Sequence, residues 1–417
     1  MESDLIDVVV IGAGPAGSIA ASIIDKAGFK VSLLEKEQFP RFIIGESLLP
    51  HCMEGFEAAG FLDVIKANGF QQKFGAKFIR GNETCDFNFS NQYTKGWDWT
   101  WQVKRADFDK TLTDELGKRG ISIFFGSKVT AVDFSKEFAR VTFVDSDGLS
   151  QSIKARFVID ASGYGRVLPR LLKLEKASIL DPKMAVFVHI TDSHRSRFQE
   201  PDRIIILSYQ EGVWGWIIPF SDNTSSMGIV GKKEFFNAQG TLEEEIFKNL
   251  IAGNAYLKKR FENQTNLFPP RKLEAWSVAT EKTFGDRFVL TGNAAEFLDP
   301  IFSSGVMFAS VSSHLAAQLV IRELRGQEID WKSDYEDFLK SGIDVFRSYV
   351  NAWYDGTLEE IFYTSDRDAE MQKQICSVLA GYVWDQSNPF VTDHATILNR
   401  LARMIRFGNR KLLTKLS

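Results

Sequence analysis

The sequence is poor in cysteine and has no cysteine pair at a spacing typical of a metal site or a disulfide. Its three cysteines, Cys52, Cys85 and Cys376, lie far apart, which argues against a disulfide-rich secreted scaffold and a cysteine zinc site. The five histidines form neither H-x-H nor H-E-x-x-H, so we predict no metal. Isolated thiols agree with a reducing compartment, and we expect a cytoplasmic protein.

An excess of positive charge is also missing. Lysine and arginine number 50 against 54 aspartate and glutamate, a formal net charge of −4, which argues against a nucleic-acid partner. No continuous apolar run reaches the ~18 residues that cross a bilayer. Acidic residues interrupt the first ten positions, unlike a signal peptide. We therefore expect no integral membrane segment.

Aromatic residues, by contrast, are abundant. The 417 residues include 35 Phe and 9 Trp, and such an interior favours a planar ligand. At roughly 100–200 residues per domain, the length predicts more than one structural unit.

The chain opens with a strand–turn–helix–strand pattern. Residues 7–11 form a short apolar run, 18–25 have a helical pattern and 30–35 form a second strand. The intervening Gly12-Ala-Gly14-Pro-Ala-Gly17 fits G-x-G-x-x-G. This unit is typical of an α/β dinucleotide-binding fold with a buried parallel sheet.

Each element of this motif has a physical role. Gly12 makes the tight turn, Gly14 lets the backbone approach a pyrophosphate, and Gly17 lets the helix pack on the strand. The helix N-terminus supplies N–H groups and partial positive charge. Glu35, 18 residues after Gly17, accepts hydrogen bonds from a ribose. The motif leaves FAD and NAD as alternatives.

The middle of the chain has a different pattern. Residues 74–89 alternate around a turn and predict an antiparallel hairpin. Residues 204–208, 213–218 and 226–230 predict strands of an antiparallel or mixed sheet, while 105–119 and 242–251 predict helices. The pattern is helical from 305 to 324, and the rest of the chain is mostly amphipathic helix.

At three of its segments the chain resembles FAD-dependent oxidoreductases of the aromatic-hydroxylase fold. These are the glycine motif, Asp160-Ala-Ser-Gly163, and Gly292-Asn-Ala294, which matches a G-D-A motif except for Asn293. A fourth segment, residues 102–109, resembles the part of the family whose arginine, here Arg105, lies near the FAD diphosphate. The resemblance implies FAD as the cofactor.

Three further segments resemble the flavin-dependent halogenases within that fold. Residues 39–50, ending in Gly45-Glu-Ser-Leu-Leu-Pro50, resemble the loop that crosses the flavin, a pattern shared with geranylgeranyl reductases. Residues 70–78 resemble the segment with the catalytic lysine, here Lys73. Trp214-Gly-Trp216-Ile-Ile-Pro219 fits the family signature W-x-W-x-I-P.

The resemblance implies a domain organisation and a set of site residues. It implies a Rossmann-like FAD-binding domain (residues 1–80, 97–180 and 273–325), an inserted antiparallel β-sheet substrate domain (81–96 and 181–272) and a C-terminal helical region (326–417). The implied catalytic residues are Lys73, Trp214 and Trp216, and the implied halide site is Ser304 with Gly305. The implied FAD contacts are Gly12, Gly14, Pro15, Ala16, Gly17, Glu35, Lys36, Arg41, Glu46, Ser47, Arg105, Val129, Asp160, Ala161, Gly163, Gly292, Asn293, Asp299, Gly305 and Val306.

The activity that the resemblance implies is halogenation of an aromatic ring of the phenol or pyrrole type. It would consume reduced FAD, O₂ and halide, with a separate flavin reductase as a possible partner. Three alternatives stay open: a flavoprotein that reduces alkenes, an aromatic hydroxylase, and a flavin-binding protein without turnover, which Asn293 keeps in view.

Local alternatives also stay open. Trp214 and Trp216 could be core residues on one face of a strand, and Lys73 could be a solvated strand residue. Arg105 could be a surface residue, and Arg41 could pair with Glu46. Residues 303–305 could form only a helix cap, and Trp353, Tyr354, Phe362 and Tyr363 could be core or lid.

Overall fold

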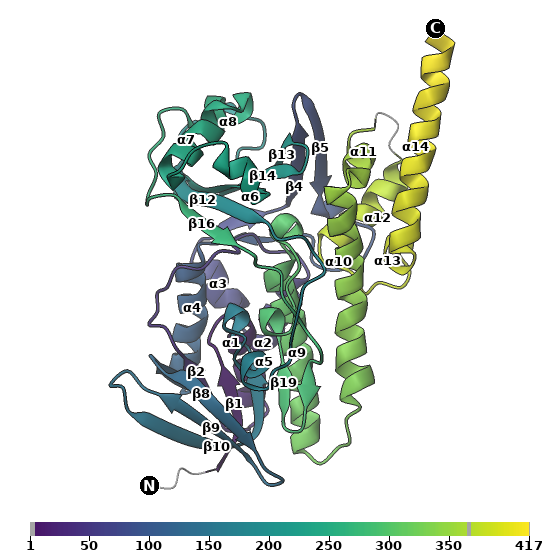
Figure 1. The fold of residues 1–417 in the computed structure, drawn as a ribbon. Helices are drawn as coiled ribbons and strands as arrows, with labels where there is room; N and C mark the ends of the chain where they lie inside the picture. Colours follow the sequence, from purple (N-terminus) through teal and green to yellow (C-terminus); the bar gives the residue numbers. More distant parts are fainter. Residues whose placement is uncertain (1–4, 365–367, 417) are drawn as a thin grey trace. The chain divides into compact units, whose positions relative to one another are not determined.

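The computed structural model describes residues 5–364 and 368–416, with side chains to residue 407, and divides into two compact units (Figure 1). Unit 1 comprises residues 1–69, 103–180 and 277–340. Unit 2 comprises residues 70–102, 181–276 and 341–417. Each unit is therefore assembled from three separate stretches of chain.

Unit 1 is built on a mostly parallel sheet in the order β18-β19-β10-β1-β2-β7. Its strands are β1 (Leu5–Ile11), β2 (Val31–Glu35), β7 (Ser122–Phe125), β8 (Lys128–Phe134), β9 (Ala139–Val144), β10 (Ser150–Asp160), β18 (Phe284–Gly285) and β19 (Phe288–Leu290). Because β1 lies between β10 and β2, the strand order reverses there, and ligands of such sheets bind beyond the carboxyl ends of the strands at this point.

Helices of unit 1 bury their apolar faces against this sheet and one another. They are α1 (Pro15–Lys26), α2 (Cys52–Ala59), α3 (Leu62–Ala67), α4 (Arg105–Lys118), α5 (Val167–Leu171) and α9 (Ser304–Leu324). Among the described residues, α9 is the one helix long and apolar enough to span a membrane, with mean hydropathy 1.4. Because 67% of that window is buried, α9 has the character of a core helix.

Strand β10 is longer than the sequence pattern predicts. A short run at 150–153 and a separate apolar run at 156–160 predict two strands, but these residues belong to one strand of 11 residues. Its first half pairs antiparallel with β9 and its second half pairs parallel with β1. One strand thus continues from the β8–β9 hairpin into the central sheet.

Unit 2 contains a seven-stranded sheet in the order β16-β12-β15-β14-β13-β4-β5 and a separate pair, β3 with β6. The strands are β3 (Gln71–Lys73), β4 (Gly75–Arg80), β5 (Glu83–Asn88), β6 (Thr100–Gln102), β12 (Met184–Thr191), β13 (Ile204–Gln210), β14 (Val213–Pro219), β15 (Thr224–Gly231) and β16 (Arg271–Glu274). A small pair, β11 (Glu175–Lys176) and β17 (Ala279–Thr280), belongs to unit 1.

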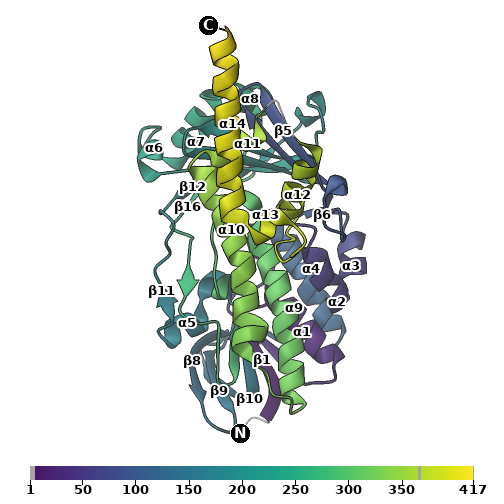
Figure 2. The ribbon, with the colours of Figure 1, turned by 90° about the vertical axis from the view of Figure 1, so that its right-hand side faces the viewer.

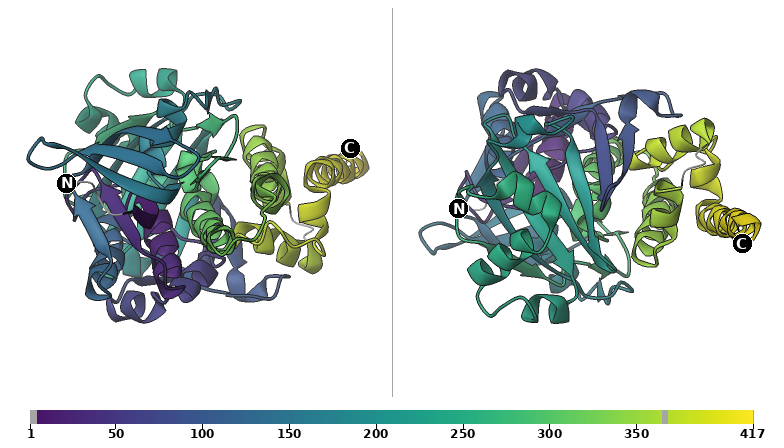
Figure 3. Two further views of the ribbon diagram at one scale, coloured as in Figure 1. Left: turned by 90° about the horizontal axis from the view of Figure 1, so that it is seen from below. Right: turned by 90° about the horizontal axis from the view of Figure 1, so that it is seen from above.

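Helices lie on both faces of the large sheet in unit 2 (Figure 3). One face packs on α6 (Lys233–Asn237), α7 (Glu243–Ala252) and α8 (Ala255–Phe261) through a cluster that includes Val188, Ile229 and Leu250. The other carries Phe78, whose ring lies 4.8 Å from that of Phe362. The C-terminal helices are α10 (Phe338–Tyr354), α11 (Thr357–Phe362), α12 (Ala369–Leu379), α13 (Pro389–Thr392) and α14 (His394–Leu416).

The expected hairpin at 74–89 is present as β4 and β5, and the helices expected at 105–119, 242–251 and 305–324 are present as α4, α7 and α9. The units are divided differently from the expected domains. Residues 70–80, where β4 pairs with β13, belong to unit 2, as do 97–102 and 273–276. The expected C-terminal region is divided, with 326–340 in unit 1 and 341–417 in unit 2.

Candidate functional site

The glycine turn connects β1 to α1 and has almost no room for side chains. Gly12 has φ +96°, and a Cβ there would lie 2.6 Å from the Ala161 carbonyl oxygen. A Cβ on Gly17 would lie 1.9 Å from the Gly12 oxygen. Pro15 occupies the start of α1, where its missing N–H costs nothing. The turn therefore depends on glycine for both its conformation and its packing.

Glu35 ends β2 beside this turn. Its buried carboxylate accepts hydrogen bonds from the backbone N–H of Ala13 at 2.9 Å and of Glu37 at 2.9 Å. Each carboxylate oxygen retains a lone pair that can accept a ribose hydroxyl. Lys36 is exposed and lies 3.6 Å from the Glu37 carboxylate.

Two arginines and one aspartate form a charged cluster near the same turn. The Asp109 carboxylate is fully buried and accepts from Arg105 Nε at 2.8 Å and Arg41 Nη1 at 3.0 Å. A Cβ on Gly14 would lie 3.5 Å from Arg41 Nη2, so this guanidinium borders the open side of the turn. Two positive charges against one negative charge suit a diphosphate.

This cluster corrects two of the local alternatives. Arg105 is buried, with its Nη1 donating to the Gly45 carbonyl at 3.2 Å, so it is not a surface residue. Arg41 pairs with Asp109 and not with Glu46. Glu46 and Ser47 are both buried, and the Glu46 carbonyl accepts from Val103 N–H at 2.8 Å. The loop containing both residues is therefore fixed to the segment that leads into α4.

The turn after β10 is organised by Asp160. Its carboxylate accepts from the N–H of Ser162 at 2.9 Å and of Leu168 at 2.6 Å. Burial raises the pKa of the Asp160 carboxyl, against the effect of these donors. The side chain thus shapes the turn, and it is the backbone of Ala161 that touches Gly12. Gly163 has φ +59° within the same turn.

The segment after β19 packs on the glycine motif. Gly292 has φ +54°, and a Cβ there would lie 3.7 Å from the Cβ of Ala16. The Gly292 N–H donates to Ser312 Oγ at 2.8 Å. Asn293 follows in the same turn, where its Oδ1 would lie 3.8 Å from a Cβ on Gly305. The glycine motif, the Asp160 turn and the Gly292 turn thus meet within unit 1.

The start of α9 is built without a side-chain cap. Ser303 adopts φ +58° and accepts no capping hydrogen bond, so the pure helix-cap alternative is not supported. Ser304 and Val306 are buried, and a Cβ on Gly305 would lie 2.9 Å from the Phe297 ring. Asp299 Oδ1 accepts from the N–H of Ile301 at 3.0 Å.

Among the predicted FAD contacts, Val129 has a side chain that is already packed in the apolar core. It packs in the apolar cluster with Val9, Ile11 and Leu34. Only its backbone could therefore serve a ligand.

The two signature tryptophans of unit 2 lie on one face of β14. Their ring centroids are 6.0 Å apart, and both side chains are buried. Trp214 Nε1 donates to Tyr354 Oη at 2.9 Å, and Trp216 Nε1 donates to Ser226 Oγ at 3.0 Å. Their burial agrees with the core alternative without excluding a second role.

Gly228 on β15 makes the space for Trp216. The two residues are directly opposite in the antiparallel pair. A Cβ on Gly228 would lie 2.3 Å from Trp216 Cζ2. The indole therefore lies across the β15 backbone, where any side chain would displace it.

Lys73 ends β3 and is only 2% exposed, so the solvated-strand alternative is wrong. Its ammonium lies 5.5 Å from the centre of the Phe89 ring. Thr100 on β6 is directly opposite and fully buried, and within the described part of the chain its hydroxyl has no hydrogen-bond partner. Facing side chains in such pairs are neighbours, which gives Lys73 a polar group beside it.

Asp109 and Tyr354 were not predicted as site residues. Asp109 stands four residues after Arg105 on α4, the spacing of an ion pair on a helix, so that signal was available in the sequence. Tyr354 lies 140 residues from Trp214 along the chain, and no local sequence pattern predicts that contact. Trp353 and Phe362, which were core or lid candidates, pack in the core of unit 2.

Comparison with known proteins agrees with this architecture. The family model described as "FAD binding domain" matches residues 5–334. A tryptophan 2-halogenase of Chondromyces crocatus is 31% identical, over 90% of this chain and 76% of that protein. This chain is an FAD-dependent oxidoreductase of the flavin-dependent halogenase family. The predicted cofactor, FAD, and the predicted enzyme class are confirmed.

Two further relatives of this halogenase-family protein cover nearly its whole length. A 1H-pyrrole-2-carbonyl-[peptidyl-carrier protein] chlorinase of Pseudomonas fluorescens is 29% identical, over 93% of this chain and 91% of that protein. A solved flavoprotein/dehydrogenase of Cytophaga hutchinsonii is 49% identical, with TM-score 0.95 over 97% of this chain and 100% of that one. The predicted α/β fold is thereby confirmed.

Proposed function

We propose that this protein halogenates an electron-rich aromatic ring of the phenol or pyrrole type, using reduced FAD, O₂ and a halide ion. The single observation that carries the proposal is the buried Lys73 in a chain that also contains W-x-W-x-I-P. Burying an ammonium group costs free energy, so a lysine that is only 2% exposed must have a role that offsets this cost. A role in holding the halogenating species is such a reason.

We propose that the predicted residues of unit 1 hold the cofactor. The glycine turn would admit the diphosphate, whose charge Arg41 and Arg105 would balance. Glu35 would accept hydrogen bonds from the ribose, and the start of α9, at Ser304 and Gly305, would offer N–H groups to halide. When bound, reduced FAD would supply two electrons to O₂ and the halide would supply the other two, so that O₂ would be reduced to one water and one hypohalous acid.

The residues of unit 2 would then control where the oxidised halogen goes. Lys73 would hold it at Nζ, and the opposite Thr100 hydroxyl would orient a water molecule or reactant beside that atom. Trp214 and Trp216 would exclude water from this region, because their ring positions are fixed by Tyr354, Ser226 and Gly228. A dry environment would prevent loss of the oxidant to solvent.

The substrate in this proposal is a small aromatic molecule, either free or attached to a carrier protein. The second form is supported by the chlorinase relative, whose name gives its substrate as a pyrrole-2-carbonyl group on a peptidyl carrier protein. We keep a separate flavin reductase as the proposed source of reduced FAD, and a cytoplasmic location as a prediction.

The test compares two lysine variants. Purified protein with FAD, a flavin reductase, NADH, bromide and a phenol or pyrrole probe should give brominated product by mass spectrometry. Lys73→Met should remove bromination while flavin absorbance stays unchanged. The matched control is Lys77→Met, because Lys77 lies four residues away, is half-buried and forms an ion pair with the exposed Glu200.

Two results would contradict the proposal. Full bromination by Lys73→Met would remove the role of the lysine. Bromide-independent formation of a hydroxylated product, or anaerobic reduction of an alkene by the wild-type protein, would replace halogenation by one of the alternative reactions.

A further inference from the structure

The last helix of unit 2, α14, is the most basic segment of the chain. Residues 394–416 contain six lysine and arginine residues and neither aspartate nor glutamate. The whole chain has a net charge of −4, so the remaining residues together have a net charge of −10. Positive charge is thus concentrated on one helix of an otherwise acidic protein.

One side of α14 is used for folding. Leu398 and Ala402 are buried, at one helical turn from each other, where α14 packs on α11 and α13. Arg406 Nε forms an ion pair with Glu360 Oε2 of α11 at 2.6 Å. At Leu398 and Ala402 the apolar side of this amphipathic helix therefore packs on the protein itself.

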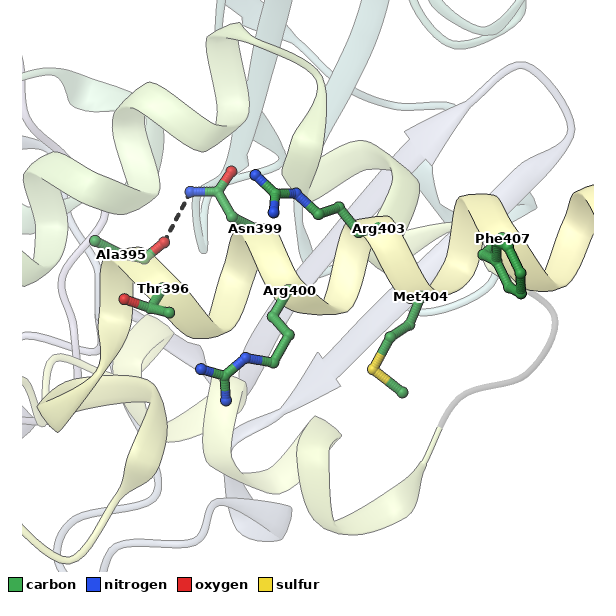
Figure 4. Close-up of a pocket in the computed structure, with 7 residues that line it drawn as sticks. All are labelled: Ala395, Thr396, Asn399, Arg400, Arg403, Met404 and Phe407. Carbon is green, nitrogen blue, oxygen red and sulfur yellow. Dashed lines mark hydrogen bonds between the residues drawn. The ribbon is translucent and has the colours of Figure 1, made fainter.

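The outward side of α14 mixes cationic and apolar groups. Arg400, Arg403 and Phe407 recur at three- and four-residue spacing, and Met404 follows Arg400 by one turn. Met404 is 66% exposed and Phe407 is 63% exposed. Figure 4 shows Arg400 and Met404 pointing to the same side of the helix, along the shallow pocket that runs from Ala395 to Phe407. In Figures 1 and 2, α14 extends past α11 and α12.

We propose that this outward side of α14, defined by Arg400, Arg403, Met404 and Phe407, binds the acidic surface of a carrier protein that delivers the substrate. The inference rests on the proposed function, because only a carrier-bound substrate needs such a surface. Charge complementarity selects an acidic partner, and the two exposed apolar side chains fit the small apolar centre of a transient protein interface.

The arrangement of these groups favours an acidic protein over a membrane. A helix that lies in a membrane interface needs a continuous apolar face. In α14 the buried apolar residues Leu398 and Ala402 face the protein, and on the outward side the exposed Arg400 and Arg403 lie within one helical turn of Met404 and Phe407. An acidic helical surface can meet such an alternation with paired carboxylates and apolar side chains.

The test measures binding and turnover separately. The probe is a peptidyl carrier protein of net negative charge, loaded with pyrrole-2-carboxylate through its phosphopantetheine arm and labelled for fluorescence anisotropy. We expect the Arg400→Glu/Arg403→Glu double variant to raise the Kd roughly tenfold or more. Met404→Ser/Phe407→Ser should weaken binding as well. The matched control is Lys248→Glu on α7, an exposed lysine away from α14, which should leave the Kd unchanged.

Bromination of a free pyrrole or phenol distinguishes this inference from the proposed function. The α14 variants should keep wild-type activity on the free ring and lose it only on the carrier-bound ring. Wild-type inactivity on every aromatic probe would contradict the proposed function, whereas anisotropy would still report carrier binding.

Three results would overturn the docking surface itself. The first is an unchanged carrier Kd in both α14 double variants. The second is wild-type binding to phosphatidylserine-containing vesicles without binding to the carrier. The third is dimerisation of the wild-type chain that the arginine reversals abolish.

Discussion

The contact between Gly228 and Trp216 gives a prediction whose size follows from the geometry. In Gly228→Ala the new methyl would lie 2.3 Å from Cζ2 and 2.4 Å from Cη2 of the indole, whereas carbon atoms in contact are about 3.5–4.0 Å apart. The ring must therefore move by more than about 1 Å. Phe187 and Trp214 lie on the same face, with ring centroids 6.2 and 6.0 Å from that of Trp216.

Two costs combine in this variant. Overpacking a core costs about 1–3 kcal/mol, and losing the hydrogen bond from Trp216 Nε1 to Ser226 Oγ, 3.0 Å long, costs about 1 kcal/mol. We expect Gly228→Ala to lower the free energy of unfolding by roughly 2–4 kcal/mol. Urea denaturation followed by tryptophan fluorescence measures this change, and near-UV circular dichroism reports the displaced indole.

A double-mutant cycle isolates the contact. Ser226→Ala removes only the hydrogen bond and should cost about 1 kcal/mol. In a Trp216→Leu background the steric conflict is absent, so Gly228→Ala should then cost less than about 0.5 kcal/mol. FAD content should not change, because both residues belong to unit 2. If Gly228→Ala were equally costly with and without the indole, the strand backbone and not the ring would be the cause, and the reasoning would fail.

Three further predictions concern unit 1. Gly17→Ala should give a colourless protein without flavin absorbance, because its Cβ would lie 1.9 Å from the Gly12 oxygen and distort the turn. A yellow product of normal FAD content would contradict this. Asp109→Asn should lower the free energy of unfolding by about 3–5 kcal/mol. Added FAD should raise the Tm of this variant more than the Tm of wild type, because the diphosphate replaces the lost negative charge. Equal FAD-induced Tm shifts in the two proteins would show that the two arginines do not face the diphosphate. Burial lowers the pKa of His314, so the unfolded chain binds the proton more readily. The free energy of unfolding should therefore fall as the pH drops below about 6.5. His314→Gln should flatten this pH dependence of the free energy of unfolding measured in urea, and an unchanged dependence would exclude this histidine as its source.

The sequence predicts most of unit 1 because its signals are local. The glycine motif, Glu35 and the helix at Arg105 stand within short windows where periodicity and turn residues define the elements. The exception is β10, where residues 154–155 carry no turn signal, yet the hydrophobic pattern changes from alternating to continuous. The change marks where the strand passes from one pairing to another and not an end of the strand.

Unit 2 is less predictable because its contacts join distant parts of the chain. Strand β4 pairs in parallel with β13, more than a hundred residues away, and no local pattern specifies that partner. The same holds for Trp214 and Tyr354. The signature W-x-W-x-I-P identifies the tryptophans, but the groups that fix their orientation come from one other strand, β15 (Ser226 and Gly228), and from the C-terminal helix α10 (Tyr354).

These distant groups show how two tryptophans of the core can also meet the needs of the proposed function. A buried indole needs apolar neighbours for its ring and an acceptor for its N–H, and in both of these rings that acceptor is a hydroxyl group. A hydrogen-bonded indole has a fixed orientation as well as a fixed place, because its donor points in one direction. In the proposed function the two rings must keep water from a reactive halogen, and a fixed orientation serves that role. The core alternative and the proposed function therefore make the same demand on these two rings, because a buried indole must satisfy its N–H donor and the partner that does so also fixes the ring.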